Sequence, residues 1–261
     1  MTQILLREDR GAVATLTLNR PEALNALSDA MLAALKEQFR ALAEDRTIRV
    51  VVIRGAGKAF CAGHDLREMQ AARQSDDRGA AYFADLFARC AAVMQAIPAL
   101  PQPVIAEVHG IATAAGCQLV ASCDMAVAAH GTRFGVNGVN IGLFCSTPMV
   151  ALTRAVPRKV AFEMLTTGEF IEADRAREVG LVNRTAPPED LSAEVQKLAA
   201  VVAGKLTAAV RTGKRAFYDQ AGMGLGAAYT LTGAVMADNM MWRDTEEGVA
   251  AFLEKRAPDW A

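Results

Sequence analysis

The chain has 261 residues, which is long enough for one large domain or for a domain with an appendage. Its 28 basic and 29 acidic side chains give a net charge of -1, so no basic field exists to attract nucleic acid or an anionic membrane. We therefore expect no nucleic-acid partner, and an anionic ligand would have to be held by local basic groups and backbone N–H groups.

Strand and helix patterns alternate through the first half of the chain. Val13–Leu18 alternates as a half-buried strand does. Ser28 can cap a helix that runs to about Asp45, with an apolar stripe formed by Met31, Leu32, Leu35, Phe39 and Leu42. The β-branched run 50–53 predicts a strand covered on both faces. The elements expected next are a loop after Gly55 and Gly57, a helix over 79–97 ended by Pro98, a strand over 104–108, a helix over 115–123 and a strand over 125–129. The pattern predicts an α/β fold.

From Pro148 onward the sequence predicts almost only helices. Pro148 suits a first helical turn, and Gly180 suits the end of a helix over 172–179. Pro187 and Pro188 open a further helix, and the last helix covers about 245–255. No flexible linker is visible, so we expect the helical part to pack on the α/β part. We divide the chain into an α/β domain over 1–195 and a C-terminal helical region over 196–261.

The cysteines and histidines predict neither a disulfide framework nor a metal site. The five cysteines have no paired spacing and have apolar neighbours, which indicates reduced thiols in a cytosol-like compartment. The three histidines are not spaced as zinc ligands are. The first ten residues fit neither a secretory signal nor a transit peptide, and the nearly uncharged stretch 110–123 is too short to span a bilayer. We expect a soluble cytoplasmic protein with no membrane partner.

Several short motifs, each weak alone, occur together in an order that is highly specific. On these motifs the chain resembles the enoyl-CoA hydratase/isomerase (crotonase) family over nearly its whole length. They are NRPEALNAL at 19–27, KAFCAGHDL at 58–66, PVIA at 103–106 leading into GIATAAGCQL at 110–119, TTG at 166–168 followed by 173–181, and EGVAAFLEKR at 247–256. Residues 114–124 and 142–148 are similar to one branch of that family, enoyl-CoA hydratase domain-containing protein 3.

The resemblance implies a crotonase-type spiral of repeated ββα turns with a helical C-terminal region, assembled as a homotrimer or a pair of trimers. It also implies an oxyanion hole, in which two backbone N–H groups bind the thioester carbonyl oxygen. By motif these are the amides of His64 and Ala115. Backbone donors survive a change of side chain, and losing one typically costs ~10²–10³ in rate.

The resemblance further implies a binding path for coenzyme A, which enters as part of the thioester substrate, so no permanently bound cofactor is expected. Glu22 departs from the family, where a basic residue is common, and this weakens the case for phosphate binding there. The last helix of such proteins often reaches a ligand held by a neighbouring subunit. The residues implied in the coenzyme A path are Ala23, Ala62, Asp65, Leu66, Arg67, Phe252 and Lys255.

The two glutamates that activate water in a hydratase fall, by motif, at Gln118 and Gly138. A glutamine can hydrogen-bond a water but cannot take its proton, and a glycine offers no side chain. General acid–base assistance is worth ~10²–10⁴ in rate, so we expect ordinary hydration to be very slow. His64 and Cys145 are candidate substitutes, but a ring lying along the coenzyme A groove and a buried inert thiol are the plainer interpretations.

Three functions therefore remain open. The first is an acyl-CoA-processing enzyme, a hydratase-like lyase or an isomerase of fatty acid metabolism, that works through a thioester enolate. The second is a protein that binds a CoA thioester with little or no hydratase activity. The third is a divergent reaction of the family, such as decarboxylation or thioester hydrolysis, that uses His64 or Cys145.

Overall fold

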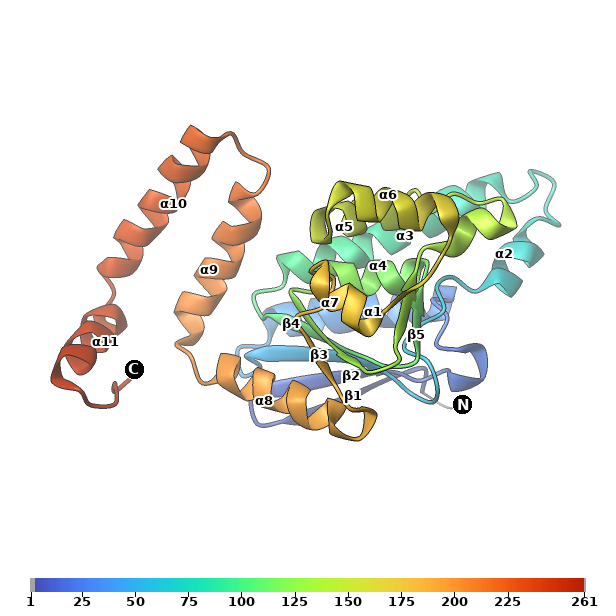
Figure 1. The fold of residues 1–261 in the computed structure, drawn as a ribbon. Coiled ribbons are helices and arrows are strands. Elements are labelled where there is room, and N and C mark those ends of the chain that lie inside the picture. The colour runs from blue at the N-terminus through green and yellow to red at the C-terminus, as the bar shows by residue number, and fades with distance from the viewer. Residues whose placement is uncertain (1–2, 261) are drawn as a thin grey trace.

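The protein is seen in a computed structural model that describes residues 3–260. Its centre is a six-stranded sheet with the strand order β1-β2-β3-β4-β6-β9 (Figure 1). The β1–β2 pairing is antiparallel, and the pairings from β2 through β9 are parallel. The strands are β1 (Leu5–Arg10), β2 (Val13–Leu18), β3 (Val50–Gly55), β4 (Val104–Val108), β6 (Met125–Ala129) and β9 (Arg184–Ala186).

A second, three-stranded sheet has the order β5-β7-β8. Its strands are β5 (Ile111–Thr113), β7 (Arg133–Gly135) and β8 (Ile171–Glu172). The chain alternates between the sheets, because β4 is followed by β5 and then by helix α4, and β6 is followed by β7 and then by further helices. The segment after β3 also reaches the second sheet, where Cys61 forms an isolated parallel bridge with Ala112 of β5. These repeats form the predicted spiral of ββα turns.

The large sheet is covered on both faces, as the β-branched run 50–53 predicts. Val51 and Ile53 join the core that also holds α1 (Asp29–Glu44), α3 (Ala80–Ala99) and α4 (Ala115–Ser122). Val50 and Val52 point the other way and pack with Leu191 and Val195 of α8 (Leu191–Ala203). Because side chains alternate along a strand, one short apolar run supplies both interfaces.

Helix α1 forms as its sequence predicts. The Ser28 hydroxyl accepts a hydrogen bond from the Met31 N–H at 3.2 Å, which satisfies one of the free amides at the helix start. All five residues of the predicted apolar stripe are buried. Helix α3 buries the face that carries Leu86, Cys90 and Ile97. By length and composition α3 could cross a bilayer, but this is weak evidence, because core helices pass the same test.

Several elements differ from the sequence prediction. The segment after Gly57 is not all loop, because it contains α2 (Leu66–Ala72), which is too short to show a helical period. Pro98 does not end α3, because it lies within the last turn of that helix. Strand β1 is missing from the prediction because its charged side chains are largely exposed. Short strands β8 and β9 interrupt the half predicted to be helical.

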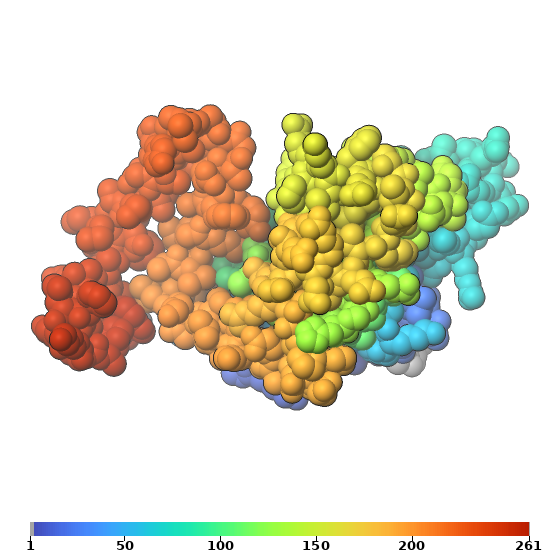
Figure 2. Space-filling model, viewed as in Figure 1, coloured from blue at the N-terminus to red at the C-terminus, as the bar shows by residue number. Residues whose placement is uncertain are grey.

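The last helices of the chain do not pack on the α/β part as expected, although the helices from Pro148 up to residue 203 do. After α8, the helices α9 (Thr207–Gln220), α10 (Leu225–Met240) and α11 (Arg243–Glu254) form an arm that stands away from the body (Figures 1 and 2). Helix α10, which the structure describes in full, buries none of its side chains. Helix α8 belongs to the body, so the division predicted at residue 195 falls inside this helix rather than at the α8–α9 turn. The remaining helices are α5 (Pro148–Ala155), α6 (Arg158–Thr167) and α7 (Ala173–Glu178), with 3₁₀ turns at Pro21–Ala23, Asn137–Ile141 and Pro188–Asp190.

One buried polar cluster fastens the arm to the body. The Lys214 ammonium of α9 donates to the carbonyl oxygens of Ile97 and Gln102, both at 2.9 Å, and to Asp124 Oδ2 at 2.7 Å. The Tyr218 hydroxyl donates to the other oxygen of Asp124 at 2.7 Å. Burial lowers the pKa of Lys214, and the Asp124 carboxylate opposes that shift. The cluster is fully hydrogen-bonded at the ammonium, so it orients α9 without leaving a buried charge unpaired.

We predict that Lys214→Met lowers the free energy of unfolding by about 3–5 kcal/mol, because it leaves the partly buried Asp124 without its cation. Urea unfolding followed by circular dichroism measures this loss. The matched control is Arg215→Met on the same helix, where an exposed pair with Asp219 contributes no more than about 1 kcal/mol. Equal effects of the two substitutions would contradict the anchoring role.

Candidate functional site

The turn from β5 into α4 lies against the segment that follows β3. The Thr113 N–H donates to the Cys61 carbonyl oxygen at 3.0 Å, and the Cys61 N–H donates to Ile111 at 3.2 Å. A Cβ at Gly116 would collide with the Cys61 carbonyl oxygen. Only a glycine therefore allows the first turn of α4 to approach this segment so closely.

The backbone N–H groups of His64 and Ala115 are brought to the same place by this approach. Gly63 has a φ of +92°, and a Cβ built on it would lie 3.3 Å from the Ala115 nitrogen. The Gly63 carbonyl accepts a hydrogen bond from the Leu27 N–H at 2.7 Å, which also ties the segment around Gly63 to the chain just before α1. Within residues 3–260, neither the His64 N–H nor the Ala115 N–H donates to a protein acceptor. Two free donors therefore lie beside the start of a helix, where the dipole favours negative charge.

Ala114 holds the start of α4 in a strained conformation. Its φ of +51° and ψ of -119° are rare for any residue that has a Cβ and cost on the order of 1–3 kcal/mol. The Ala114 N–H donates to the Gly135 carbonyl at 2.9 Å, which ties the turn to β7. A further bond of 2.6 Å joins the Thr113 hydroxyl to Asn137 Oδ1. From the sequence, Asn137 could orient a polar group of a substrate or serve the turn, and neither interpretation predicts this link to Thr113.

The His64 residue is partly buried, and both of its ring nitrogens are buried. Neither ring nitrogen has a hydrogen-bond partner among the described residues, and the ring meets Phe87 edge to face at 5.8 Å. Burial lowers the pKa of His64, and the Leu27 backbone only partly opposes this. The ring is therefore neutral at pH 7, and it can exchange a proton only with a group that enters the site.

Gln118 lies one turn into α4 and is 4% exposed. Its side-chain oxygen has no partner among the described residues. Gln118 also borders a cavity of about 670 Å³ between α3, α4, α5 and α9, part of the hollow seen beside α9 in Figure 2. This large cavity does not include His64 or Ala115. We place the candidate site at the two amides rather than in the cavity, because free backbone donors are what can polarise a carbonyl.

Gly138 is a packing glycine, and the space beside it is filled. It is buried in the 3₁₀ turn Asn137–Ile141, and a Cβ there would collide with the Leu143 carbonyl oxygen. The same Cβ would lie 2.8 Å from Cys145 Sγ. The loop up to Cys145 therefore occupies the room that a side chain at position 138 would need.

The cysteine thiols near the site are protonated. Burial raises the pKa of Cys61 and of Cys117 to about 12, and it raises the pKa of Cys145 as well. A thiol held in this form is a poor nucleophile, so the plainer interpretation of Cys145 is supported. Among residues 3–260 no group of three His, Cys, Asp or Glu side chains could hold a metal ion.

Four of the residues implied in the coenzyme A path lie in neighbouring segments. Ala23 precedes Leu24, whose carbonyl accepts from the Ala62 N–H at 3.0 Å. Leu66, 57% exposed, and the exposed Arg67 begin α2 directly after the site. All four are at least partly accessible.

The Asp65 carboxylate is already engaged. It accepts from the Arg67 N–H at 3.0 Å and caps α2. Its other oxygen pairs with the Arg20 guanidinium at 3.1 Å. Asp65 therefore joins the turn after β2 to the start of α2, which is a positioning role rather than a free binding group.

The two C-terminal residues of the predicted path lie elsewhere. Phe252 is 82% exposed on α11, and Lys255 follows that helix. Figure 1 shows α11 and α2 at opposite ends of the molecule. One chain therefore does not bring Phe252 and Lys255 to Ala62 and Arg67.

Comparison with known proteins agrees with the fold and the motifs. A family profile described as "Enoyl-CoA hydratase/isomerase" matches residues 8–261. A relative from Xenopus laevis, "Enoyl-CoA hydratase domain-containing protein 3, mitochondrial", is 45% identical over 98% of this chain and 85% of its own. A crystal structure of an enoyl-CoA hydratase from Mycobacterium smegmatis is 57% identical, covers 99% of both chains and has a TM-score of 0.94. The crystal structure of human enoyl-CoA hydratase domain-containing protein 3 is 44% identical, covers 99% of this chain and 100% of its own, and has a TM-score of 0.93.

The expectation of a cytoplasmic protein is wrong. The Xenopus laevis relative and those of the same name from Mus musculus and Homo sapiens are all called mitochondrial. The expectation rested on free thiols, and the structure does describe five free cysteines. Reduced thiols indicate a reducing environment but do not distinguish the cytosol from another reducing compartment.

We predict that Gly138→Glu lowers stability and does not create hydratase activity, because the new side chain collides with the Leu143 backbone. Overpacking alone costs about 1–3 kcal/mol, and burying a carboxylate adds to this. Thermal unfolding and a crotonyl-CoA hydration assay measure both effects. Gln118→Glu is the matched control, because it introduces a carboxyl group at a buried position whose native side chain already has that size, so it adds the cost of burying the carboxyl without overpacking. A Gly138→Glu protein as stable as the native one would contradict the packing argument.

Proposed function

Because the chain belongs to the enoyl-CoA hydratase/isomerase family, we propose that it binds an acyl-CoA thioester and stabilises its enolate-like form. The observation that carries the proposal is the pair of free N–H groups at His64 and Ala115. Donors held in place before the substrate arrives need no rearrangement when charge develops on the thioester oxygen. The start of α4 adds the positive end of its dipole at the same point.

The thioester is proposed to enter along Ala23, Ala62, Leu66 and Arg67. These residues are accessible and lie next to the two amides, and Arg67 supplies a cation for a phosphate group. Asp65 would hold this path in place, because it pairs with Arg20 and caps the start of α2. No permanently bound cofactor enters the proposal, since coenzyme A arrives with the substrate.

Proton transfer is the part of hydratase chemistry that these residues serve poorly. The Gln118 amide can orient a water through its unpartnered oxygen but cannot remove a proton from it. Position 138 has no room for a carboxylate in this loop conformation. A second candidate function, favoured by this packing, is therefore a protein that binds CoA thioesters with little or no hydratase activity. Thioester hydrolysis by Cys145 is disfavoured, because burial raises the pKa of its thiol.

We predict that butyryl-CoA binds about 10-fold or more tightly than S-butyl-CoA, a thioether that lacks the carbonyl and so leaves both amides unpaired. Isothermal titration calorimetry measures the difference. Infrared difference spectra of carbonyl-labelled butyryl-CoA should show the thioester stretch shifted to lower frequency, because the two N–H groups polarise the bond. The thioether serves as the matched ligand control.

Equal affinities for the two ligands would overturn the oxyanion-hole assignment, and no binding of either would remove the thioester proposal altogether. The second candidate function is tested by turnover of crotonyl-CoA. Without general acid–base assistance, hydration should be slower by ~10²–10⁴ than in an enzyme that has it. Robust turnover would reject the candidate function of binding without catalysis.

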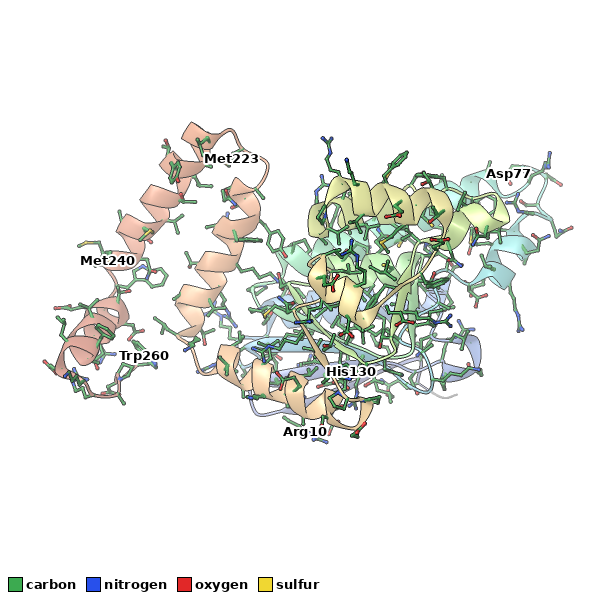
Figure 3. All side chains as sticks on the ribbon, in the orientation of Figure 1. Arg10, Asp77, His130, Met223, Met240 and Trp260 are labelled. Carbon is green, nitrogen blue, oxygen red and sulfur yellow. The ribbon has the colours of Figure 1, made fainter. Side chains whose placement is uncertain are left out.

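We also propose that the chain assembles as a homotrimer or a pair of trimers, in which α11 of one copy brings Phe252 and Lys255 to the coenzyme A path of another. The arm supports this proposal, because it exposes large apolar side chains that a single copy leaves uncovered. These include Leu225, Tyr229, Met236, Met240, Met241 and Leu253, and Figure 3 shows Met240 on α10. Exposed apolar surface of this kind marks interaction sites.

We predict a trimer or hexamer by size-exclusion chromatography with light scattering. The double substitution Met236→Glu with Met240→Glu should shift it toward monomer, because each carboxylate would have to be buried in the interface. Val201→Glu on the exposed side of α8 is the matched control and should leave the mass unchanged. A monomeric native chain would overturn the assembly.

A further inference from the structure

A second cavity, of about 520 Å³, lies at the junction of the body and the arm. It is formed by the α1–β3 turn, the α8–α9 turn, the first turns of α9 and the C-terminal end of the described chain. Figure 3 places Trp260 on the side of the arm that faces the start of α9. The residues that the argument uses are Arg46, Arg49, Lys205, Arg211, Asp244 and Trp260.

Four basic side chains converge on this cavity, opposed by one carboxylate. Arg49 donates to the Ala203 carbonyl at 3.0 Å and Arg211 to the Ile48 carbonyl at 3.2 Å, so these two also hold the turns together. Asp244 pairs with Arg243. Clustered like charges repel one another, and an anion among them relieves that repulsion. The cluster is unusual in a chain whose net charge is -1.

Several donors in the cavity lack a protein acceptor. The side chains of Arg46 and Lys205 are exposed and make no hydrogen bond or ion pair with any other described residue. The Arg211 Nε atom is buried and has no partner in the described part of the chain. This nitrogen has almost no accessible surface, so a ligand in the cavity would interact with the Arg211 guanidinium through its charge and not through the Nε–H.

The start of α9 adds backbone donors to the same cavity. Its N-cap is Leu206, which offers no side-chain cap, and its first turn contains no acidic residue. The N–H groups of Thr207 and Ala208 have no acceptor among residues 3–260, since the first helical bond is donated by the Val210 N–H to the Leu206 carbonyl. A 14-residue helix that begins without a cap beside four basic side chains provides the N–H groups and the dipole that bind phosphate.

We propose that this cavity binds the phosphate groups of a small nucleotide, a nucleoside diphosphate or triphosphate. Arg46, Arg49 and Lys205 would hold the phosphates with the amides of Thr207 and Ala208, and the Arg211 guanidinium would add its positive charge at the wall of the cavity. The Trp260 indole offers a flat apolar surface for the base. Guanidinium groups match the geometry of phosphate oxygens, which favours a phosphorylated ligand over a simple carboxylate.

This site is separate from the proposed thioester site. Arg49 comes directly before β3, whereas Cys61 and His64 follow its other end. A six-residue strand is about 20 Å long, so the two sites lie near opposite ends of β3. The inference therefore does not depend on the proposed function, and either one can fail alone.

The test is calorimetry of the full chain with sodium pyrophosphate, and then with ADP, at physiological ionic strength. We expect one saturable site, tighter binding of ADP than of pyrophosphate, and weaker ADP binding in Trp260→Ala. The double substitution Arg46→Gln with Lys205→Gln should weaken both ligands by about 10-fold or more, because two charge-assisted contacts are lost. Neither side chain makes a hydrogen bond or ion pair with another described residue, so this variant should fold and unfold as the native chain does.

The matched control is Arg40→Gln, which removes an exposed cation of α1 that pairs with Glu37 outside the cavity. It should leave ADP binding unchanged, and the double variant should still bind butyryl-CoA. No saturable binding of pyrophosphate or ADP, or equal binding by the double variant, would overturn the site. Equal affinity for ADP and pyrophosphate would overturn the nucleotide assignment, as would tighter binding of a single-stranded oligonucleotide than of ADP.

Discussion

A Cβ on residue 116 would strike the Cys61 carbonyl oxygen, and much of this structure depends on that one close approach. It allows the start of α4 to lie against the segment after β3, so that the N–H groups of Ala115 and His64 share one place. Ala114 is held at positive φ in the same turn, by bonds that reach β7. The spiral supplies the packing that maintains this strain, since β3, β4 and their helices form one core.

In the proposed site, groups that could bind a thioester are present, whereas groups that could transfer a proton are not. The donors that would polarise a carbonyl belong to the backbone, so they persist whatever side chains the turn carries. Proton transfer needs side chains, and here the side chains are an amide at Gln118 and none at Gly138. A side chain at position 138 is not merely absent, because Leu143 and Cys145 also fill the space that it would need. Under the proposed function, such a site would bind a thioester better than it would hydrate it.

The arm extends the molecule in a second direction. It is fastened by Lys214 and Tyr218 to Asp124, which lies just after α4 and also accepts from the Val104 N–H at 2.6 Å. The start of β4, the end of α4 and the arm therefore meet at one carboxylate. The apolar face of α10, the remote position of Phe252 and the basic cavity at the base of α9 are all consequences of an arm that leaves the body.

The sequence by itself determined the elements whose signals are local. The Ser28 cap, the apolar stripe of α1 and the β-branched run 50–53 each depend on residues close in the chain, and each was predicted correctly. The motifs around His64 and Ala115 likewise identified the family. Only the tertiary structure decided what lies beside each residue: that Arg20 already holds Asp65, that a loop fills the space at Gly138, and that α10 and α11 leave the body. Such contacts join segments distant in sequence, and no local pattern of hydrophobicity or propensity records them.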